Sequence, residues 1–183
     1  AAGLGCPSED IVVCSTGLIG EELDADKMRT GITAALAALS PDGGSDAAGA
    51  IMTTDTRRKE ATVLAPAGWS VSGMSKGAGM LAPGLATMLV LLTTDAVVNA
   101  ATCDAALRAA TAVTFDRLDS DGCMSTNDTV VLMASGAGEI APSQIEFCEA
   151  VRRVCFDLTM QMLSDAEGAD HDLASVLEIA GDP

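Results

Sequence analysis

Hydrophobic and polar positions along the chain follow two periods, and together they predict alternating strands and helices. Short apolar runs rich in β-branched residues are typical of strands, and they occupy residues 10–14, 61–64, 69–74, 88–92 and 129–134. Apolar residues recur at helical spacing after Asp24, across residues 101–115 and after Ser143. The pattern therefore favours an α/β fold, in the broad sense that includes α+β.

Polar residues indicate where the first helix begins and ends. Asp24 is a good N-cap for an alanine-rich helix. The apolar positions of this helix share one face: Met28, Ile32, Leu36 and Leu39. Residues 41–45 break it, and a short helical segment is then predicted up to Ile51.

A second start signal opens the longest predicted helix. Ser143 and Glu146 have the spacing of a capping box, in which each residue satisfies a free backbone N–H at the helix start. The helix is predicted to run to about Ser164, with these residues facing inward: Ile145, Cys148, Val151, Cys155 and Met162. A further strand is expected near Asp172.

Composition and charge suit one globular domain over the 183 residues. Apolar residues make up 49% of the chain and its mean hydropathy is +0.34, which is ample for a packed core. The formal net charge is −16 and only 2% of the residues are aromatic. Nucleic acid is therefore not expected as a partner, because phosphate binding needs a basic surface and base stacking needs aromatic rings.

Cysteine and histidine usage narrows the chemistry further. The six cysteines form no C-x-x-C pair and no signal peptide is found, which favours reduced thiols in the cytoplasm. The uncharged run after Lys76 contains glycine and proline in its first half, so it predicts a loop and a core strand rather than a membrane span. His171 is the only histidine, and neither a Ser-His-Asp triad nor a metal site is predicted.

One stretch, residues 76–89 (KGAGMLAPGLATML), presents a threonine for chemistry. It holds several turn-forming residues: Gly77, Gly79, Pro83 and Gly84. The following apolar run is typical of a buried strand, so a loop delivers Thr87 to the mouth of that strand. Taken alone, this pattern favours a threonine that merely begins a strand, and only the family resemblance of the whole stretch reverses that preference.

The stretch resembles the self-cleaving junction of the ornithine acetyltransferase / glutamate N-acetyltransferase family of arginine biosynthesis (the ArgJ family), whose precursor splits at an Ala-Thr bond. Ala86-Thr87 matches that bond, whereas Gly84-Leu85 departs from the usual larger polar residue and methionine. The resemblance covers nearly the whole chain but only the middle of the family's sequence, so we expect an internal fragment.

The resemblance implies a layered sandwich of β-sheets between helices, in an autoprocessed enzyme of the N-terminal-nucleophile type. One acetyltransferase domain would span residues 1–183. Self-cleavage would divide it into an alpha-chain part, residues 1–86, and a beta-chain part, residues 87–183. The two chains would stay associated, as a heterotetramer of two alpha and two beta chains.

Self-cleavage also accounts chemically for the activation of Thr87. A threonine hydroxyl is a weak nucleophile at neutral pH, and an N-terminal threonine can use its own α-amine as the base. An α-amine titrates at about 7.7–8.0, close to the value that suits a general base. The cut at Ala86-Thr87 and the activation of the nucleophile are therefore predicted to be one event.

Further roles follow from the resemblance, and each has a structural alternative. Thr16 and Gly17, in the segment CSTGLIG, match the family's oxyanion hole, although Ser-Thr-Gly after a strand is also an ordinary turn. Thr53 and Lys76 match substrate contacts, with Lys76 suited to an α-carboxylate. Glu167 matches an acidic ligand for the ammonium of ornithine, although acidic residues before glycine are common at helix ends.

The segment DGCMSTNDT, residues 121–129, resembles a family signature, but we assign it no catalytic role. It imitates a calcium loop without the final bidentate glutamate, so no calcium site is predicted.

The implied reaction is transfer of an acetyl group from N-acetyl-L-ornithine to L-glutamate through an acetyl-threonine on Thr87. No cofactor is expected, and acetyl-CoA stays open as an alternative acetyl donor. Two other functions are also considered: hydrolysis by an autoprocessed amidase or aminopeptidase, and a truncated scaffold without catalysis. Threonine at position 87, with Thr53 and Lys76 in register, favours transfer.

Overall fold

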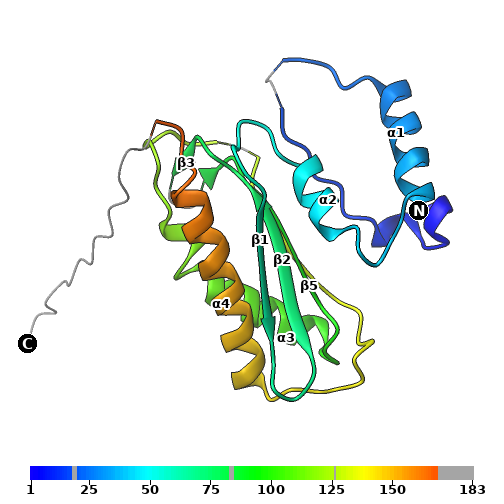
Figure 1. Ribbon diagram of the computed structural model, residues 1–183, viewed down its shortest axis with the longest axis vertical. Helices are drawn as coiled ribbons and strands as arrows, with labels where there is room; N and C mark the ends of the chain where they lie inside the picture. Colours follow the sequence, from blue (N-terminus) through cyan, green and yellow to red (C-terminus); the bar gives the residue numbers. More distant parts are fainter. Residues whose placement is uncertain (18–19, 83–84, 126, 169–183) are drawn as a thin grey trace, which may run out of the picture.

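The computed structural model describes residues 1–17, 20–82, 85–125 and 127–168, and it has a four-stranded sheet at its centre (Figure 1). The strands lie in the order β1-β2-β5-β6. Their bounds are Lys59–Leu64 (β1), Ser70–Lys76 (β2), Leu89–Thr94 (β5) and Thr129–Ala134 (β6). The pairs β1-β2 and β2-β5 are antiparallel, whereas β5 and β6 are parallel. A crossover through α3 (Ala100–Thr111) joins the parallel pair, as such a pair requires.

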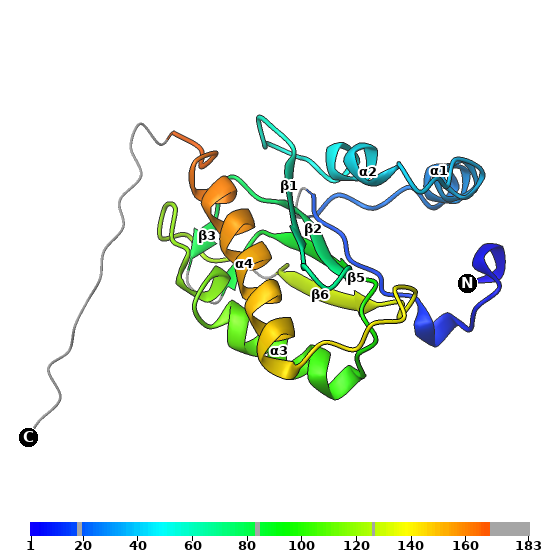
Figure 2. The same ribbon diagram turned by 60° about the horizontal axis from the view of Figure 1, so that its bottom comes forward.

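Two helices cover one face of this sheet. Figure 2 shows α3 beside α4 (Gln144–Leu163) on the same side of the strands. Alternate strand residues point toward these helices and are fully buried, among them Val71, Val90 and Leu92. The buried stripe of α4 meets them: Phe147, Val151, Val154, Leu158 and Met162. Burying each such side chain stabilises the fold by about 1.5–3 kcal/mol.

The capping box at the start of α4 is confirmed. Ser143 Oγ accepts a hydrogen bond from the Glu146 N–H at 3.3 Å, and the Ser143 N–H donates to Glu146 Oε2 at 3.1 Å. The prediction that Ile145 faces inward is wrong, because its exposure is 82%. At 100° per residue Ile145 lies about 200° around the helix from Phe147, on the opposite side from the buried stripe.

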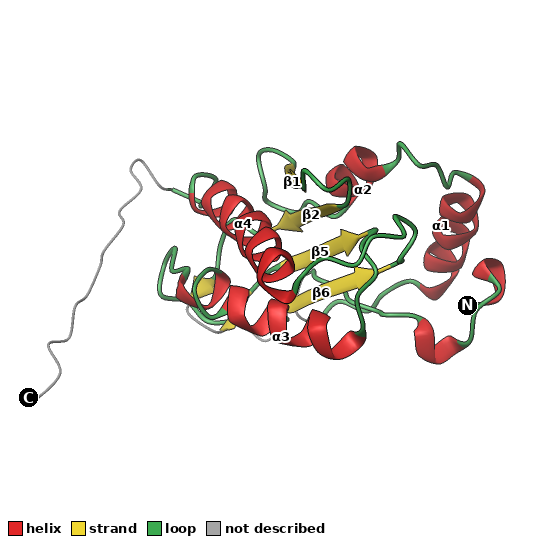
Figure 3. Ribbon diagram, turned by 90° about the horizontal axis from the view of Figure 1, so that it is seen from below, coloured by secondary structure: helices red, strands yellow, loops and turns green. Residues whose placement is uncertain are grey.

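The opposite face of the sheet is covered less completely. The short helix α2 (Gly44–Ala50) contacts β1 and β2 there. Helix α1 (Ala25–Ala37) begins at the predicted cap Asp24 but lies away from the sheet, near the N-terminus (Figure 3). It has no buried residue, and Met28 and Ile32 of its apolar face are exposed. The fold is thus a mixed α/β arrangement around one four-stranded sheet, and the sandwich of β-sheets stays a prediction.

The strand predictions succeed where the sheet supplies a neighbour. The strand at residues 129–134 is observed with the predicted bounds as β6, and those at residues 61–64, 69–74 and 88–92 agree with β1, β2 and β5 within a few residues. The prediction of a strand at residues 10–14 is wrong. Residues 11–17 form no strand and Val13 is 81% exposed, because no other described strand pairs with its backbone groups.

Two very short strands connect the glycine-rich stretch to β5. Leu81–Ala82 (β3) pairs antiparallel with Leu85–Ala86 (β4), and Thr87 follows directly. The predicted turn includes Pro83 and Gly84, which lie outside the described residues, as do His171 and the strand expected near Asp172. Across the described part of the chain, no helix combines the length and the apolar character that a membrane crossing requires.

Candidate active site around Thr87

A pocket of about 430 Å³ lies where the glycine-rich stretch approaches the N-terminal segment and the end of α4. It brings together all the side chains that the sequence singled out and the structure describes: Thr16, Gly17, Thr53, Lys76, Thr87 and Glu167. Thr54, Ala78, Met80 and Asp121 also line the pocket. Five separate chain segments therefore meet at one concavity.

Thr87 lies between β4 and β5 and lines this pocket. Its N–H donates to the Met80 carbonyl at 2.9 Å, which fixes the backbone beside the Ala86-Thr87 bond. Its Oγ is buried and has no hydrogen-bond partner in the described structure. An unpartnered buried hydroxyl is unusual because burial without a hydrogen bond costs about 1–3 kcal/mol. Among the described residues, no group therefore engages this hydroxyl.

Lys76 ends β2 and lies beside the loop that carries Thr53. The Lys76 side chain is almost completely buried, with 2% exposure, and its Nζ donates to Thr53 Oγ at 3.2 Å. Burial lowers the pKa of Lys76 below its ordinary 10.5, and the positive charge of Lys59 lowers it further. The negative charges of Asp55 and Asp128 raise the pKa but do not cancel this effect. The described residues give Lys76 no salt bridge. A carboxylate ligand in the pocket would add to the partial compensation by Asp55 and Asp128.

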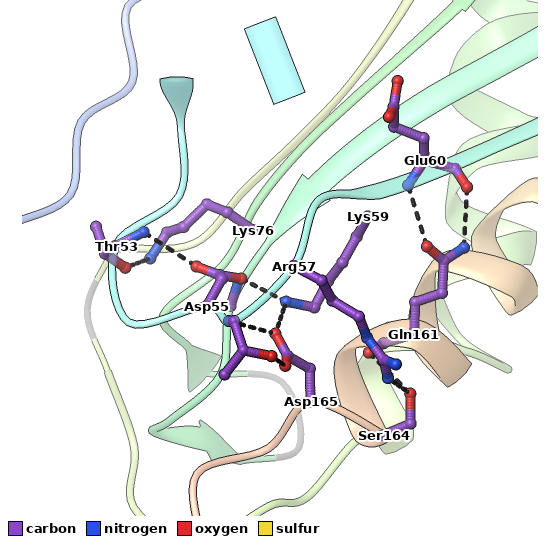
Figure 4. A network of polar contacts seen from close by, with 11 residues as sticks. Thr53, Asp55, Arg57, Lys59, Glu60, Lys76, Gln161, Ser164 and Asp165 are labelled. Atoms are coloured by element: carbon purple, nitrogen blue, oxygen red, sulfur yellow. Dashed lines mark hydrogen bonds and ion pairs between the residues drawn. The ribbon is translucent and has the colours of Figure 1, made fainter. Parts of the chain in front are cut away.

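A buried ionic cluster holds the loop around Lys76 in place (Figure 4). Lys59 Nζ lies 2.5 Å from Asp55 Oδ1 and 2.5 Å from Asp165 Oδ2, and the three side chains are at most 3% exposed. Asp55 also accepts the Gly77 N–H at 2.7 Å and the Thr53 N–H at 3.1 Å. The cluster thereby ties the Thr53 loop to the end of β2.

Both carboxylates of this cluster stay ionised for the same reason. Burial by itself would raise the pKa of Asp55, but the hydrogen bonds from Gly77, Lys59 and Thr53 outweigh it and hold the pKa below its ordinary 3.8. Burial likewise opposes ionisation of Asp165, and its bonds from Lys59 and Thr56 again bring the pKa below the ordinary value. Lys59 therefore interacts with two carboxylates at once.

Glu167 enters the pocket from the residues after α4. Two positions before it, Asp165 anchors the chain to Lys59, and the Glu167 N–H donates to the Ala78 carbonyl at 2.6 Å. A Cβ added at Gly79 would lie only 3.0 Å from Glu167 Oε2, so glycine at this position leaves room for the carboxylate. Glu167 is exposed at the pocket.

Thr16 and Gly17 line the same pocket from the N-terminal segment. Thr16 is partly buried and Gly17 is exposed. Because residues 11–17 form no strand, these two residues do not follow a strand as predicted. Their position nevertheless places a hydroxyl and a backbone N–H on the wall of the pocket that contains Thr87.

Several residues of the site could not be recognised from the sequence. Asp121 belongs to the segment 121–129, which had no assigned role, yet it lines the pocket and bonds to Met80. Lys59 stands in the charged run RRKE, which is typical of a solvated surface. Its only local signal is Asp55 four residues earlier. Asp165 is 106 residues away from Lys59, so spacing carries no sign of their contact.

The converging hydroxyl, ammonium and carboxylate groups are those expected of a small-molecule enzyme pocket. Comparison with known proteins identifies the family: the chain matches the ArgJ family over residues 1–182, and it belongs to that family.

Three curated relatives carry the name arginine biosynthesis bifunctional protein ArgJ. The Streptomyces avermitilis protein is 59% identical over 172 residues, covering 94% of this chain and 44% of its own length. The Thermobifida fusca protein is 56% identical over 99% of this chain and 46% of its own length. The Bifidobacterium longum protein is 51% identical over 94% of this chain and 45% of its own length. The chain thus spans less than half the length of these relatives.

Proposed function

We propose that this chain carries the nucleophile of an acetyltransferase that moves the acetyl group of N-acetyl-L-ornithine to L-glutamate. The observation that carries the proposal is the buried hydroxyl of Thr87, which has no partner among the described residues and shares one pocket with Lys76 and Glu167. Family membership supports it, because the relatives are named as arginine biosynthesis proteins. The layered sandwich, the cytoplasmic location and the heterotetramer of two alpha and two beta chains belong to the same proposal.

Self-cleavage comes first. Thr87 Oγ attacks the carbonyl carbon of Ala86, and its proton passes to the Thr87 nitrogen as the carbon–nitrogen bond breaks. The product is an ester between Ala86 and Thr87, which water hydrolyses to a carboxylate on Ala86 and a free hydroxyl on Thr87. The new α-amine then has a pKa suited to a general base.

Acetyl transfer follows in two steps, acylation of Thr87 and then transfer of the acetyl group to glutamate. Thr87 Oγ attacks the acetyl carbonyl of N-acetylornithine, and its proton passes by way of the α-amine to the nitrogen of the breaking amide bond. Ornithine leaves as the amine, and the acetyl group stays as an ester on Thr87. The amine of glutamate then attacks that ester and restores the hydroxyl. Thr16 Oγ and the Gly17 N–H would stabilise the oxyanion in each step, and the loss of one such donor typically costs about 10²–10³ in rate.

The charged groups of the pocket suit an amino acid with a second amine. Lys76 forms no salt bridge among the described residues and would bind the α-carboxylate. Glu167 is exposed at the same pocket and would bind the side-chain ammonium of ornithine. Thr53 holds Lys76 Nζ in position.

The test combines an intact mass spectrum with a labelled donor, on the full gene-encoded chain. We expect two chains that separate between Ala86 and Thr87, and label that moves from N-acetylornithine to glutamate. Thr87→Ala should abolish cleavage and transfer together, whereas Thr93→Ala, an exposed threonine on β5, should retain both. Normal cleavage in Thr87→Ala would contradict the mechanism.

The label also separates the competing functions. Release of labelled acetate would show an amidase or aminopeptidase, in which water takes the acyl group. No movement of label by a correctly folded full chain would favour a scaffold. Labelled acetyl-CoA in place of N-acetylornithine tests the second acetyl donor.

A further inference from the structure

Met80 has a backbone conformation that a side chain of its type rarely adopts. Its φ is +53°, in the left-handed region that favours glycine, and among the described non-glycine residues only Glu139 shares this feature. Residues held in this region are under strain and need surrounding contacts to keep them there. Met80 lies on the pocket wall, so its strain falls beside the proposed nucleophile.

Both backbone polar groups of Met80 make contacts that bear on Thr87. The Met80 N–H donates to Asp121 Oδ2 at 2.9 Å, and the Met80 carbonyl accepts the Thr87 N–H at 2.9 Å. The backbone of Met80 therefore links the Asp121 carboxylate to the Thr87 nitrogen, which belongs to the bond to be cut. The bond from Met80 also lowers the pKa of Asp121, so the carboxylate is ionised at neutral pH.

Ser120 strengthens the same attachment. The Ser120 N–H donates to the Leu81 carbonyl at 2.7 Å, and the Leu81 N–H donates to Ser120 Oγ at 3.2 Å. Leu81 in turn pairs with Ala86 across the small β3-β4 sheet. Two adjacent residues of one loop thus hold the segment that lies opposite the Ala86-Thr87 bond.

We propose that Asp121 is a positioning residue for Thr87, which acts by holding Met80 in its left-handed conformation. The inference rests on the proposed function, because it takes Thr87 as the self-cleaving nucleophile. Asp121 touches neither reacting atom. It fixes the direction of the Met80 carbonyl, and that carbonyl fixes the direction of the Thr87 N–H.

This direction matters in both stages of the chemistry. During self-cleavage the Thr87 nitrogen is the leaving group, and it must receive the proton that Oγ gives up. The hydrogen already on the Thr87 nitrogen is bonded to the Met80 carbonyl. The lone pair that develops on this nitrogen can therefore face the Thr87 hydroxyl. After cleavage the same carbonyl can accept one hydrogen of the α-amine and leave its lone pair directed to Oγ.

The experiment measures the rate at which the full gene-encoded chain splits between Ala86 and Thr87, by intact mass spectra taken over time after synthesis. Asp121→Ala should slow cleavage about tenfold to a hundredfold, the effect of losing one hydrogen bond to a charged group. Asp119→Ala is the matched control. Asp119 is an exposed acid of the same loop that bonds to the Gly122 N–H at 2.8 Å instead of to Met80, and its removal should leave the rate close to that of the parent.

A second substitution tests the route through Met80. Glycine adopts positive φ without the penalty that methionine incurs, so Met80→Gly added to Asp121→Ala should restore much of the lost rate. A purely structural role of Asp121 would not give this rescue. Asp121→Asn keeps one acceptor oxygen for the Met80 N–H, so it should cleave faster than Asp121→Ala even if the two variants have the same melting temperature.

The outcomes distinguish this inference from the function on which it rests. A parent that cleaves and an Asp121→Ala variant that cleaves at the same rate would overturn the inference alone. A variant with normal cleavage but a raised KM for N-acetylornithine would also overturn it and make Asp121 a substrate ligand. A full-length parent that stays intact would overturn the proposed function and this inference with it.

Discussion

Lys59 and Lys76 are both almost fully buried, but they lie on opposite faces of the sheet in different surroundings. Lys59 pairs across the strands with Ser75, so the next residue, Lys76, points to the other face. Lys59 contacts two carboxylates at 2.5 Å. Lys76 contacts the hydroxyl of Thr53 and opens into the pocket.

The two lysines differ in how the fold compensates their buried charge. A buried ammonium is costly unless it is paired, and Lys59 has its pairing within the fold. Lys76 has a lowered pKa because burial is only partly compensated by Asp55 and Asp128. The first lysine therefore joins secondary-structure elements, and the second is suited to a ligand that brings its own negative charge.

The largest expected effect is on stability at Lys59. Lys59→Met would leave Asp55 and Asp165 buried without their cation, and breaking such a pair typically costs about 3–5 kcal/mol. Urea unfolding measures the loss, and Lys76→Met is the matched control. Lys76→Met should cost far less, because it leaves no salt-bridged carboxylate unpaired. Equal losses in the two variants would remove the distinction drawn between the two lysines.

The next effect is on substrate affinity at Lys76. Lys76→Met should raise the KM for N-acetylornithine about tenfold to a hundredfold, the cost of one charged hydrogen bond to the substrate carboxylate. We expect kcat to change less, because the α-carboxylate is bound equally in the ground state and the transition state. Lys27→Met, at an exposed lysine of α1, is the control. A fall in kcat at constant KM would place Lys76 in the chemical step instead.

The smallest effect near neutral pH is the acid dependence of the Lys59 cluster. Asp55 and Asp165 have pKa values below the ordinary 3.8 in the folded protein. Their contribution to stability is therefore complete above that ordinary value and is lost as the pH falls through the lower folded-state values. Urea midpoints measured across this acid range should fall less steeply in Asp165→Asn than in the parent. Parallel curves would show that Asp165 does not couple folding to pH.

Local signals explain which parts of the fold could be predicted. The bounds of β6 and the capping box of α4 were predicted from residues that are neighbours in the chain. The prediction of a strand at residues 10–14 was wrong, because a strand forms only where a second strand pairs with it. An apolar, β-branched run does not indicate whether such a partner exists. The prediction that Ile145 faces inward was wrong, because one apolar residue near a helix cap does not indicate which side of the helix packs on the sheet.

The candidate site divides in the same way. Resemblance to a family pointed to Thr16, Gly17, Thr53, Lys76, Thr87 and Glu167, and the fold places them around one pocket. The residues that hold this pocket together were not predictable. Asp121 bonds to Met80 across 41 positions, and Lys59 bonds to Asp165 across 106.

The sequence by itself determined the family, the candidate nucleophile and most element boundaries, because caps, turns and periodic burial depend on residues a few positions apart. Only the tertiary structure decided which lysine is paired and which faces the pocket. It also revealed that Thr87 Oγ has no hydrogen-bond partner among the described residues, and that the backbone of Met80 links Asp121 to Thr87. These features depend on backbone groups and charges from distant segments meeting at hydrogen-bond distance, and the packing of α4 and the loops against the sheet sets those distances.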